Sequence, residues 1–430
     1  MAGAQGRLLP PSIPYRFFIA SSLYQILAWG MLFFSADQVS FFQGGTGYVL
    51  AALHALTLGV FVMVAMGASF QVLPVVTNQS FPSLWPVKLA SYLYIPGVGA
   101  LVAGFAMSHD LAMASGGALA TAGLGVYVII IGRLLLDASG FKVLTSHIWF
   151  AFVALMALVL LGLGMIFNFM PTDQNVSATA HATVAIFGFM GLFAMGFASI
   201  LVPMFALANP AVEGRSLFVM AVYGAGLVLA AYGALAEQLE VFVLGAGLLL
   251  VGSVSHVQVM KALLKKGMKK KLGISFVLIK TSWVLFPVSI AVGIAGVSGI
   301  PYEPTLLIAG YLAVFGWLLT FILGVQQQIM PFLAAMNVSK AGGRPPRLSQ
   351  LAQGRPLKIH AVCHFAAVGL LGIGIITQLE PAIQAGAIFG IVGAIAFLWF
   401  TLDVYKRMLI SARKPSIPDS TMPTQERSPT

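Results

Sequence analysis

Long apolar runs, separated by short polar stretches, follow one another through nearly the whole of this sequence. An α-helix needs about 20 apolar residues to cross the hydrocarbon core of a bilayer, and these runs are of that length. Only 8% of the residues are charged, whereas soluble proteins carry about 25%, so the chain cannot cover a water-facing surface. The apolar residues do not alternate with polar ones, which excludes a transmembrane β-barrel. The sequence therefore predicts an all-α integral membrane protein.

Reading along the chain, we predict twelve transmembrane helices. They lie at residues 15–36, 47–76, 86–107, 111–134, 147–169, 177–207, 215–236, 240–262, 273–298, 304–335, 358–378 and 383–409. The predicted organisation is a cytoplasmic segment over residues 1–14, a membrane domain over 15–410 and a disordered, Pro/Ser/Thr-rich cytoplasmic tail over 411–430.

Basic residues in the loops of the predicted membrane domain are confined to alternate loops. Every second loop, both terminal segments included, carries them, and the remaining loops carry only acidic charges: Asp37, Asp110, Asp173, Glu237, Glu240, Glu303 and Glu380. Because Lys and Arg in short loops stay on the cytoplasmic side, we predict that both termini are cytoplasmic and that the protein resides in the cell (inner) membrane. The net charge of +11 is then a consequence of topology, and nucleic acid is not an expected partner.

Three of the predicted helices share the template Gly-x7-Gly-x6-Pro. It begins at Gly59 in the second helix, Gly188 in the sixth and Gly316 in the tenth, with four helices from each copy to the next. We therefore predict three four-helix repeats, at about residues 15–134, 147–262 and 273–409, arranged as three arcs with pseudo-threefold symmetry. Helix packing alone is another explanation of the glycines.

On these residues the chain resembles subunit I of the haem–copper oxidases and the large subunit of the nitric-oxide reductases. The resemblance covers nearly the whole chain in architecture, and its sequence motifs are confined to the three template helices. It implies that histidines near the outer ends of the second, sixth and tenth helices bind metal. His54 stands where the family's low-spin haem ligand stands, and His181 stands where the family places a copper ligand.

Other residues that the resemblance requires are missing. The tenth helix has Ala309 and Tyr311 in place of His-x-His, the seventh lacks the His-His pair of the copper site, and position 185 is Ala185 rather than tyrosine. We therefore expect no terminal oxidase activity and no copper. The prediction is a divergent subunit I-like protein that binds one b-type haem and acts in respiratory electron transfer, gas sensing or assembly, with other respiratory subunits as candidate partners. If it is an enzyme, it is an oxidoreductase.

Three interpretations of His54 and His181 stay open: axial haem ligands, with Tyr311 as a further candidate; relics that bond neighbouring helices; or the lining of a polar path. The alternative class of function is a cofactor-free transporter or channel, or a structural subunit. Secondary transporters usually show inverted repeats or two halves rather than three parallel repeats.

Two further polar features lie inside predicted helices. Lys280 is either a proton-relay residue or a side chain that extends to the interface. His360 and His364 lie four residues apart on one helix face, which can hold a metal, although interfacial histidines are the favoured interpretation. The single cysteine, Cys363, excludes cysteine-based zinc and iron–sulfur sites.

Overall fold

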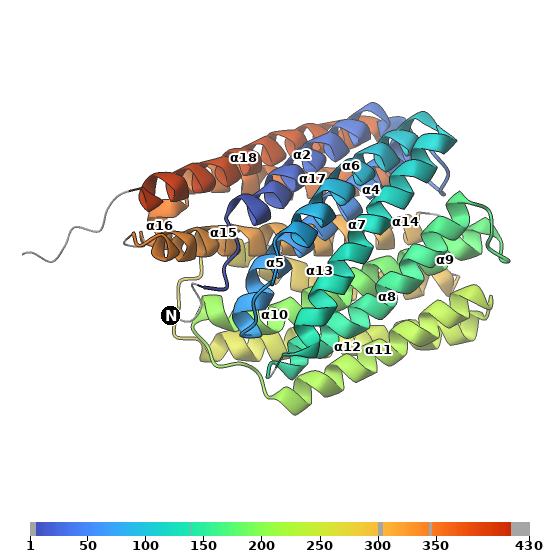
Figure 1. The fold of residues 1–430 in the computed structure, drawn as a ribbon. Coiled ribbons are helices and arrows are strands. Elements are labelled where there is room, and N and C mark those ends of the chain that lie inside the picture. Colours follow the sequence, from blue (N-terminus) through green and yellow to red (C-terminus); the bar gives the residue numbers. More distant parts are fainter. Residues whose placement is uncertain (1–5, 139, 300–303, 344–345, 414–430) are drawn as a thin grey trace, which may run out of the picture.

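The computed structural model describes residues 6–138, 140–299, 304–343 and 346–413. Over these residues the chain contains twelve helices that are long and apolar enough to cross a membrane, as the sequence predicts, and no strand. The long helices pack side by side in one bundle, and α18 ends at the same end of the bundle as α2 begins (Figure 1). The predicted tail lies outside the described residues from 414 onward.

Among the described residues, nine of the spans are single α-helices. They are α2 (Ser12–Phe34), α6 (Trp85–Met107), α7 (Asp110–Leu136), α8 (Lys142–Ile166), α11 (Glu213–Leu235), α12 (Leu239–Lys266), α13 (Ile274–Val297), α17 (Gly354–Thr377) and α18 (Glu380–Ala412). Two short helices, α3 (Ala36–Val39) and α16 (Leu348–Leu351), lie between spans. The observed ends differ from the predicted ones by a few residues in either direction: α8 begins five residues earlier than predicted, at Lys142, and ends three residues earlier, at Ile166.

The second, sixth and tenth spans are interrupted helices. Each starts as an α-helix, passes through a π-helical segment and continues as an α-helix. The second span is α4 (Tyr48–Leu56), η1 (Thr57–Val62) and α5 (Met63–Val76); the sixth is α9 (Gln174–Thr183), η2 (Val184–Met190) and α10 (Gly191–Ala206); the tenth is α14 (Thr305–Tyr311), η3 (Leu312–Leu319) and α15 (Thr320–Lys340). The sequence repeat is thus matched by a repeat in backbone conformation.

The most extensive packing occurs within three hairpins, α6/α7, α11/α12 and α17/α18. Glycines permit it. A Cβ on Gly97 would meet the backbone of Ala120, and a Cβ on Gly245 would meet the backbone of Ala230. Small residues at such crossings let two helices approach closely, which is the main source of packing energy where lipid removes any hydrophobic drive.

The hairpins are linked in a recurring order. The last helix of each predicted repeat contacts the first helix of another: α7 contacts α8, α12 contacts α13, and α18 contacts α2. Each repeat therefore has two neighbours, and the first and last helices of the chain lie together. The arrangement of the repeats as three arcs about an axis stays a prediction.

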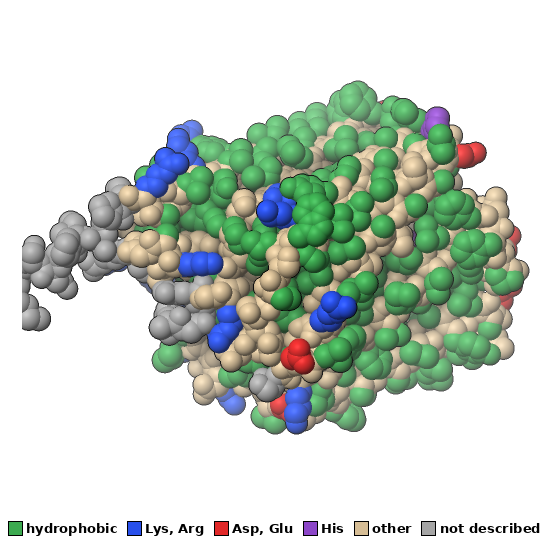
Figure 2. Space-filling model, in the orientation of Figure 1, with side chains coloured by type: hydrophobic (Ala, Val, Ile, Leu, Met, Phe, Trp, Pro, Cys, Tyr) green, Lys and Arg blue, Asp and Glu red, His purple; other side chains and the backbone are tan. Residues whose placement is uncertain are grey.

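Charged side chains are distributed unevenly along the bundle. On the face shown in Figure 2, Lys and Arg lie toward the end where α2 begins, and acidic side chains appear at the opposite end. Some acidic residues accompany the basic ones, as in the exposed pair of Lys142 and Glu213, 3.7 Å apart. Lys280 is exposed on α13 rather than buried in the bundle, which fits a side chain that reaches the interface better than an internal relay.

Candidate functional site

The three π-helical segments meet inside the bundle. The segment η3 contacts both η1 and η2, and the segments contain Gly59, Gly188 and Gly316, the first glycines of the three templates. A π-helical turn holds an extra residue, which changes the direction of the side chains on either side of it, and such turns are frequent at functional sites. His54 and His181 both lie within one turn before a π segment. This region is therefore the candidate site.

His54 is held by its own helix and by α6. Its ring packs on the ring of Phe105 with 4.5 Å between centroids, and its Nδ1 lies 3.0 Å from the carbonyl oxygen of Leu50. A carbonyl oxygen only accepts hydrogen bonds, so Nδ1 carries the proton and donates. Nε2 then holds a lone pair, which is the tautomer and the backbone anchoring that a metal-binding imidazole requires.

His181 lies against α8. Gly162 of that helix leaves room for the ring, because a Cβ there would come 3.1 Å from Cε1 of His181. Nδ1 faces the same helix, because it would lie 3.5 Å from that Cβ, and the ring interacts with the backbone of Leu158 on α8. The imidazoles of His181 and His54 are close enough to interact electrostatically. Two histidines that are far apart in sequence thus lie within electrostatic range of each other, and imidazole is a donor that haem iron takes.

Tyr311, the third candidate ligand, is engaged elsewhere. Its hydroxyl donates a hydrogen bond to the carbonyl oxygen of Val368 on α17. Its ring lies against Gly372 of the same helix, where a Cβ would meet the hydroxyl at 2.7 Å. The side chain therefore joins α14 to α17, and its role as a haem ligand stays a prediction.

A stack of three aromatic rings fills the junction of η2, η3 and α13. Trp317 lies between Phe286, at 3.6 Å between centroids, and Phe187, at 5.9 Å, with interplanar angles of 9° and 17°. Tyr223 of α11 donates a hydrogen bond to the carbonyl oxygen of Phe187, 3.0 Å away. These rings provide dispersion contacts and no metal ligand. The stack could not be predicted from the sequence, because its members come from three separate helices.

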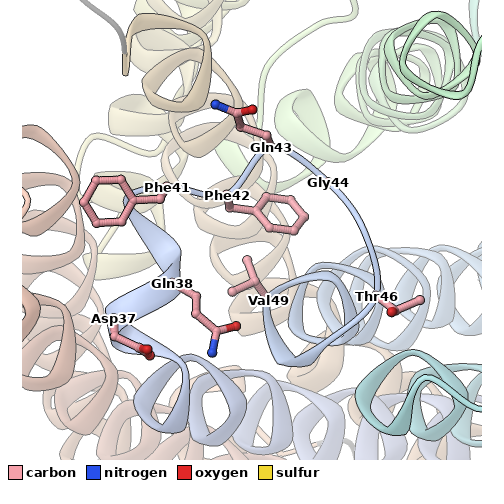
Figure 3. Close-up of a pocket in the computed structure, with 8 residues that line it drawn as sticks. All are labelled: Asp37, Gln38, Phe41, Phe42, Gln43, Gly44, Thr46 and Val49. Carbon is pink, nitrogen blue, oxygen red and sulfur yellow. The ribbon is translucent and has the colours of Figure 1, made fainter.

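A pocket of about 310 Å³ opens beyond the start of α4. Figure 3 shows its lining, which comes entirely from the segment between α2 and the first turn of α4: Asp37, Gln38, Phe41, Phe42, Gln43, Gly44, Thr46 and Val49. Val49 lies between one and two turns before His54 on the same helix. The pocket contains neither candidate histidine, so it is not the candidate site.

A second group of polar side chains lies between α15 and α17. His364 places Nε2 2.8 Å from Oγ1 of Thr320, and Thr320 donates its own hydroxyl proton to the carbonyl oxygen of Phe315, also at 2.8 Å. His364 must therefore donate from Nε2. His360 bonds through Nδ1 to the amide of Gln327 at 3.2 Å. The two histidines are 0% and 3% exposed, so both face the interior of the bundle.

Several buried polar atoms on α2, α5, α15 and α17 lack a hydrogen-bond partner among the described residues. They are Oε1 of Gln25, Nε1 of Trp29, both amide atoms of Gln71 and of Gln326, Oε1 of Gln327 and Nε2 of His360. We call these six residues the polar file. An unpaired buried group costs about 1–3 kcal/mol, and a whole protein is stable by only about 5–15 kcal/mol. Eight such atoms therefore require partners beyond the described protein groups.

Comparisons with known proteins bear on the fold. No protein-family model matches this sequence, and no curated protein matches it. Among solved structures, the chain is similar to that of a haem–copper terminal oxidase dimer determined by cryo-electron microscopy. The TM-score is 0.65 at 10% sequence identity, over 96% of this chain and 86% of the other. The chain therefore has the fold of a haem–copper oxidase membrane subunit, as the resemblance implied.

The polar file is a feature that the sequence did not lead us to predict. Each of its glutamines, taken alone, is an ordinary polar residue in a long apolar run. A signal was nevertheless present: Gln326 and Gln327 are adjacent within an apolar helix, and polar side chains inside a membrane are costly unless they have a function.

Proposed function

We propose that this chain is a haem–copper oxidase subunit I-like protein of the inner membrane, with both termini cytoplasmic, in which His54 and His181 bind one b-type haem. Its role is in respiratory electron transfer, gas sensing or assembly with other respiratory subunits, and it does not reduce oxygen as a terminal oxidase. The observation that carries the proposal is the placement of two imidazoles, one in the second span and one in the sixth, within one turn of π segments that both contact η3.

The residues around the pair support a binding role. The carbonyl oxygen of Leu50 fixes the proton of His54 on Nδ1, which leaves Nε2 as a neutral donor. Phe105 shields one side of this ring from solvent, and Gly162 gives His181 its place beside α8. When bound, a haem supplies one-electron redox chemistry or a binding position for a diatomic gas.

Two absences in the sequence set the limits of the proposed activity. Ala309 stands where the tenth helix of the family offers a haem ligand, and Ala185 stands where oxygen-reducing members have a tyrosine. The stack of Phe187, Trp317 and Phe286 occupies the junction between the sixth and tenth spans. We therefore assign His54 and His181 to one haem rather than to a haem–copper pair.

The test is an optical spectrum of the full-length protein, purified after haem-replete expression and recorded oxidised and then dithionite-reduced. We expect a Soret band and a reduced α band, with a pyridine haemochrome assay giving one haem b per chain. His54→Ala and His181→Ala should each lower the haem content strongly, since each would remove a nitrogen that holds the haem. Wild-type protein without a Soret band would contradict the proposal and favour the transporter, channel or structural-subunit alternative.

His256→Ala is the matched control. His256 is also a buried histidine within a span, but it lies outside the candidate site, so its variant should keep the haem. Equal loss of colour in all three variants would show a general folding defect rather than ligand loss.

A further inference from the structure

The polar file extends along the bundle at successive depths. Tyr15 of α2 donates a hydrogen bond to the carbonyl oxygen of Met330 on α15, 3.2 Å away, and the rings of Trp29 and Phe315 lie 5.3 Å apart. These two contacts place α2 antiparallel to the tenth span, with Tyr15 level with Met330 of α15 and Trp29 level with Phe315 of η3. Gln25, one turn from Trp29, is therefore level with Thr320, the partner of His364.

The other members of the file continue toward the end where α2 begins. Gln326 and Gln327 follow Thr320 by about two turns on α15, and Gln327 bonds to His360. Gln71 lies nearest to the end where α2 begins, because its neighbour Phe70 packs on Phe17 of α2 with 5.9 Å between ring centroids. Its helix, α5, also contacts α15. At 1.5 Å per residue, the file spans about 20 Å from Trp29 to Gln71.

Every member of the file is at most 3% exposed, and every one has a polar atom without a partner among the described residues. Amides and imidazoles at this depth bond to water where they have no protein partner, since a buried water makes about three hydrogen bonds to otherwise unpaired groups. Apolar cavities stay dry, whereas unpaired polar groups at these depths offer water the partners that it needs.

We propose that the polar file lines an internal chain of water molecules, which runs from Gln71 to the level of Trp29 and contacts His360 and His364. The proposal does not depend on haem, because none of its atoms belongs to His54 or His181. It gives the His360/His364 pair a role as part of the polar lining.

The test is radiolytic hydroxyl-radical labelling of the intact protein in nanodiscs, read by mass spectrometry peptide by peptide. Radicals form from water, so a buried residue is labelled when it touches bound water. We expect strong labelling of the peptide that contains His360 and His364, well above that of Met63 and Met66, which are fully buried among apolar residues. Repeating the exposure in H₂¹⁸O should transfer the heavy isotope to the same peptide.

Two variants make the result specific. Gln327→Leu and Gln71→Leu remove polar lining at two depths and should each reduce the labelling of His360. Gln328→Leu is the control, because Gln328 bonds to Ser275 on α13, outside the file, and its variant should label as the wild type does. If the glutamines instead pair with one another and keep the seam dry, His360 will stay as unlabelled as Met63, and the proposal fails. Normal labelling of His360 in both leucine variants would equally overturn it.

Discussion

At the residue scale, the buried hydrogen bonds depend on which atom of each side chain carries the proton and therefore donates. Thr320 donates its only hydroxyl proton to the carbonyl oxygen of Phe315, so it must accept from His364. His54 could be singled out by its place in the repeat, as could His181, but the partners of His360 and His364 could not be predicted. Those partners are 33 and 44 residues distant, and only the packing of α15 on α17 brings them together.

Thr320→Val tests the contribution of one of these bonds. Valine keeps the shape of the side chain and removes the acceptor, which leaves the Nε2 proton of His364 unpaired in the bundle. We expect the free energy of unfolding to fall by about 1–3 kcal/mol, measured by chemical unfolding in detergent. Thr377→Val removes a hydroxyl that bonds to the carbonyl oxygen of Ile373 at an exposed position, and it should change stability little. An equal loss in both variants would contradict the argument.

At the element scale, the helices were predictable and their interruptions were not. Lipid offers the backbone no hydrogen-bond partners, so an apolar run of sufficient length has to become a helix. The switch from α to π hydrogen bonding leaves no comparable mark in the composition. The template glycines Gly59, Gly188 and Gly316 did mark the places, but glycine at such a spacing also serves simple packing, and the sequence could not separate the two.

The glycines of α7 give a test of packing at this scale. A Cβ on Gly116 would meet the backbone of Leu101 on α6, whereas nothing lies within 4 Å of a Cβ on Gly125. Gly116→Ala should therefore destabilise the protein by about 1–3 kcal/mol through overpacking. Gly125→Ala should be neutral or stabilising by up to about 1 kcal/mol, since alanine favours the helix. Thermal unfolding in detergent measures both, and a reversed order would show that α6 and α7 do not pack as described.

At the scale of the whole molecule, the fold was predictable because twelve apolar runs and one repeat leave few alternatives. The similarity to a haem–copper terminal oxidase at 10% identity shows how little sequence this architecture needs. The cofactor is a different matter. Ligand identity depends on a few side chains, and the tenth span of this chain lacks the histidines that would have made the prediction specific.

The orientation in the membrane is also a whole-molecule property. In a Cys363→Ala background, which removes the single buried thiol, we would place one cysteine at Gln43 and, in another variant, one at Lys266, both exposed positions at opposite ends of the bundle. An impermeant maleimide added to intact cells should label Gln43→Cys and spare Lys266→Cys until the cells are opened, because basic loops stay inside. The opposite pattern would invert the predicted topology.

The interrupted spans have a consequence for how such a protein can change. A π turn is equivalent to one residue inserted into an α-helix, and one residue corresponds to a rotation of about 100° around the helix axis. Deleting a single position within η1 would leave the second span apolar, membrane-long and helical, yet it would swing His54 about a quarter-turn away from His181. In this architecture the direction of a histidine side chain depends on the rotation of its helix about its axis. The insertion or deletion of one residue can therefore create or remove a binding site while the histidine itself is unchanged.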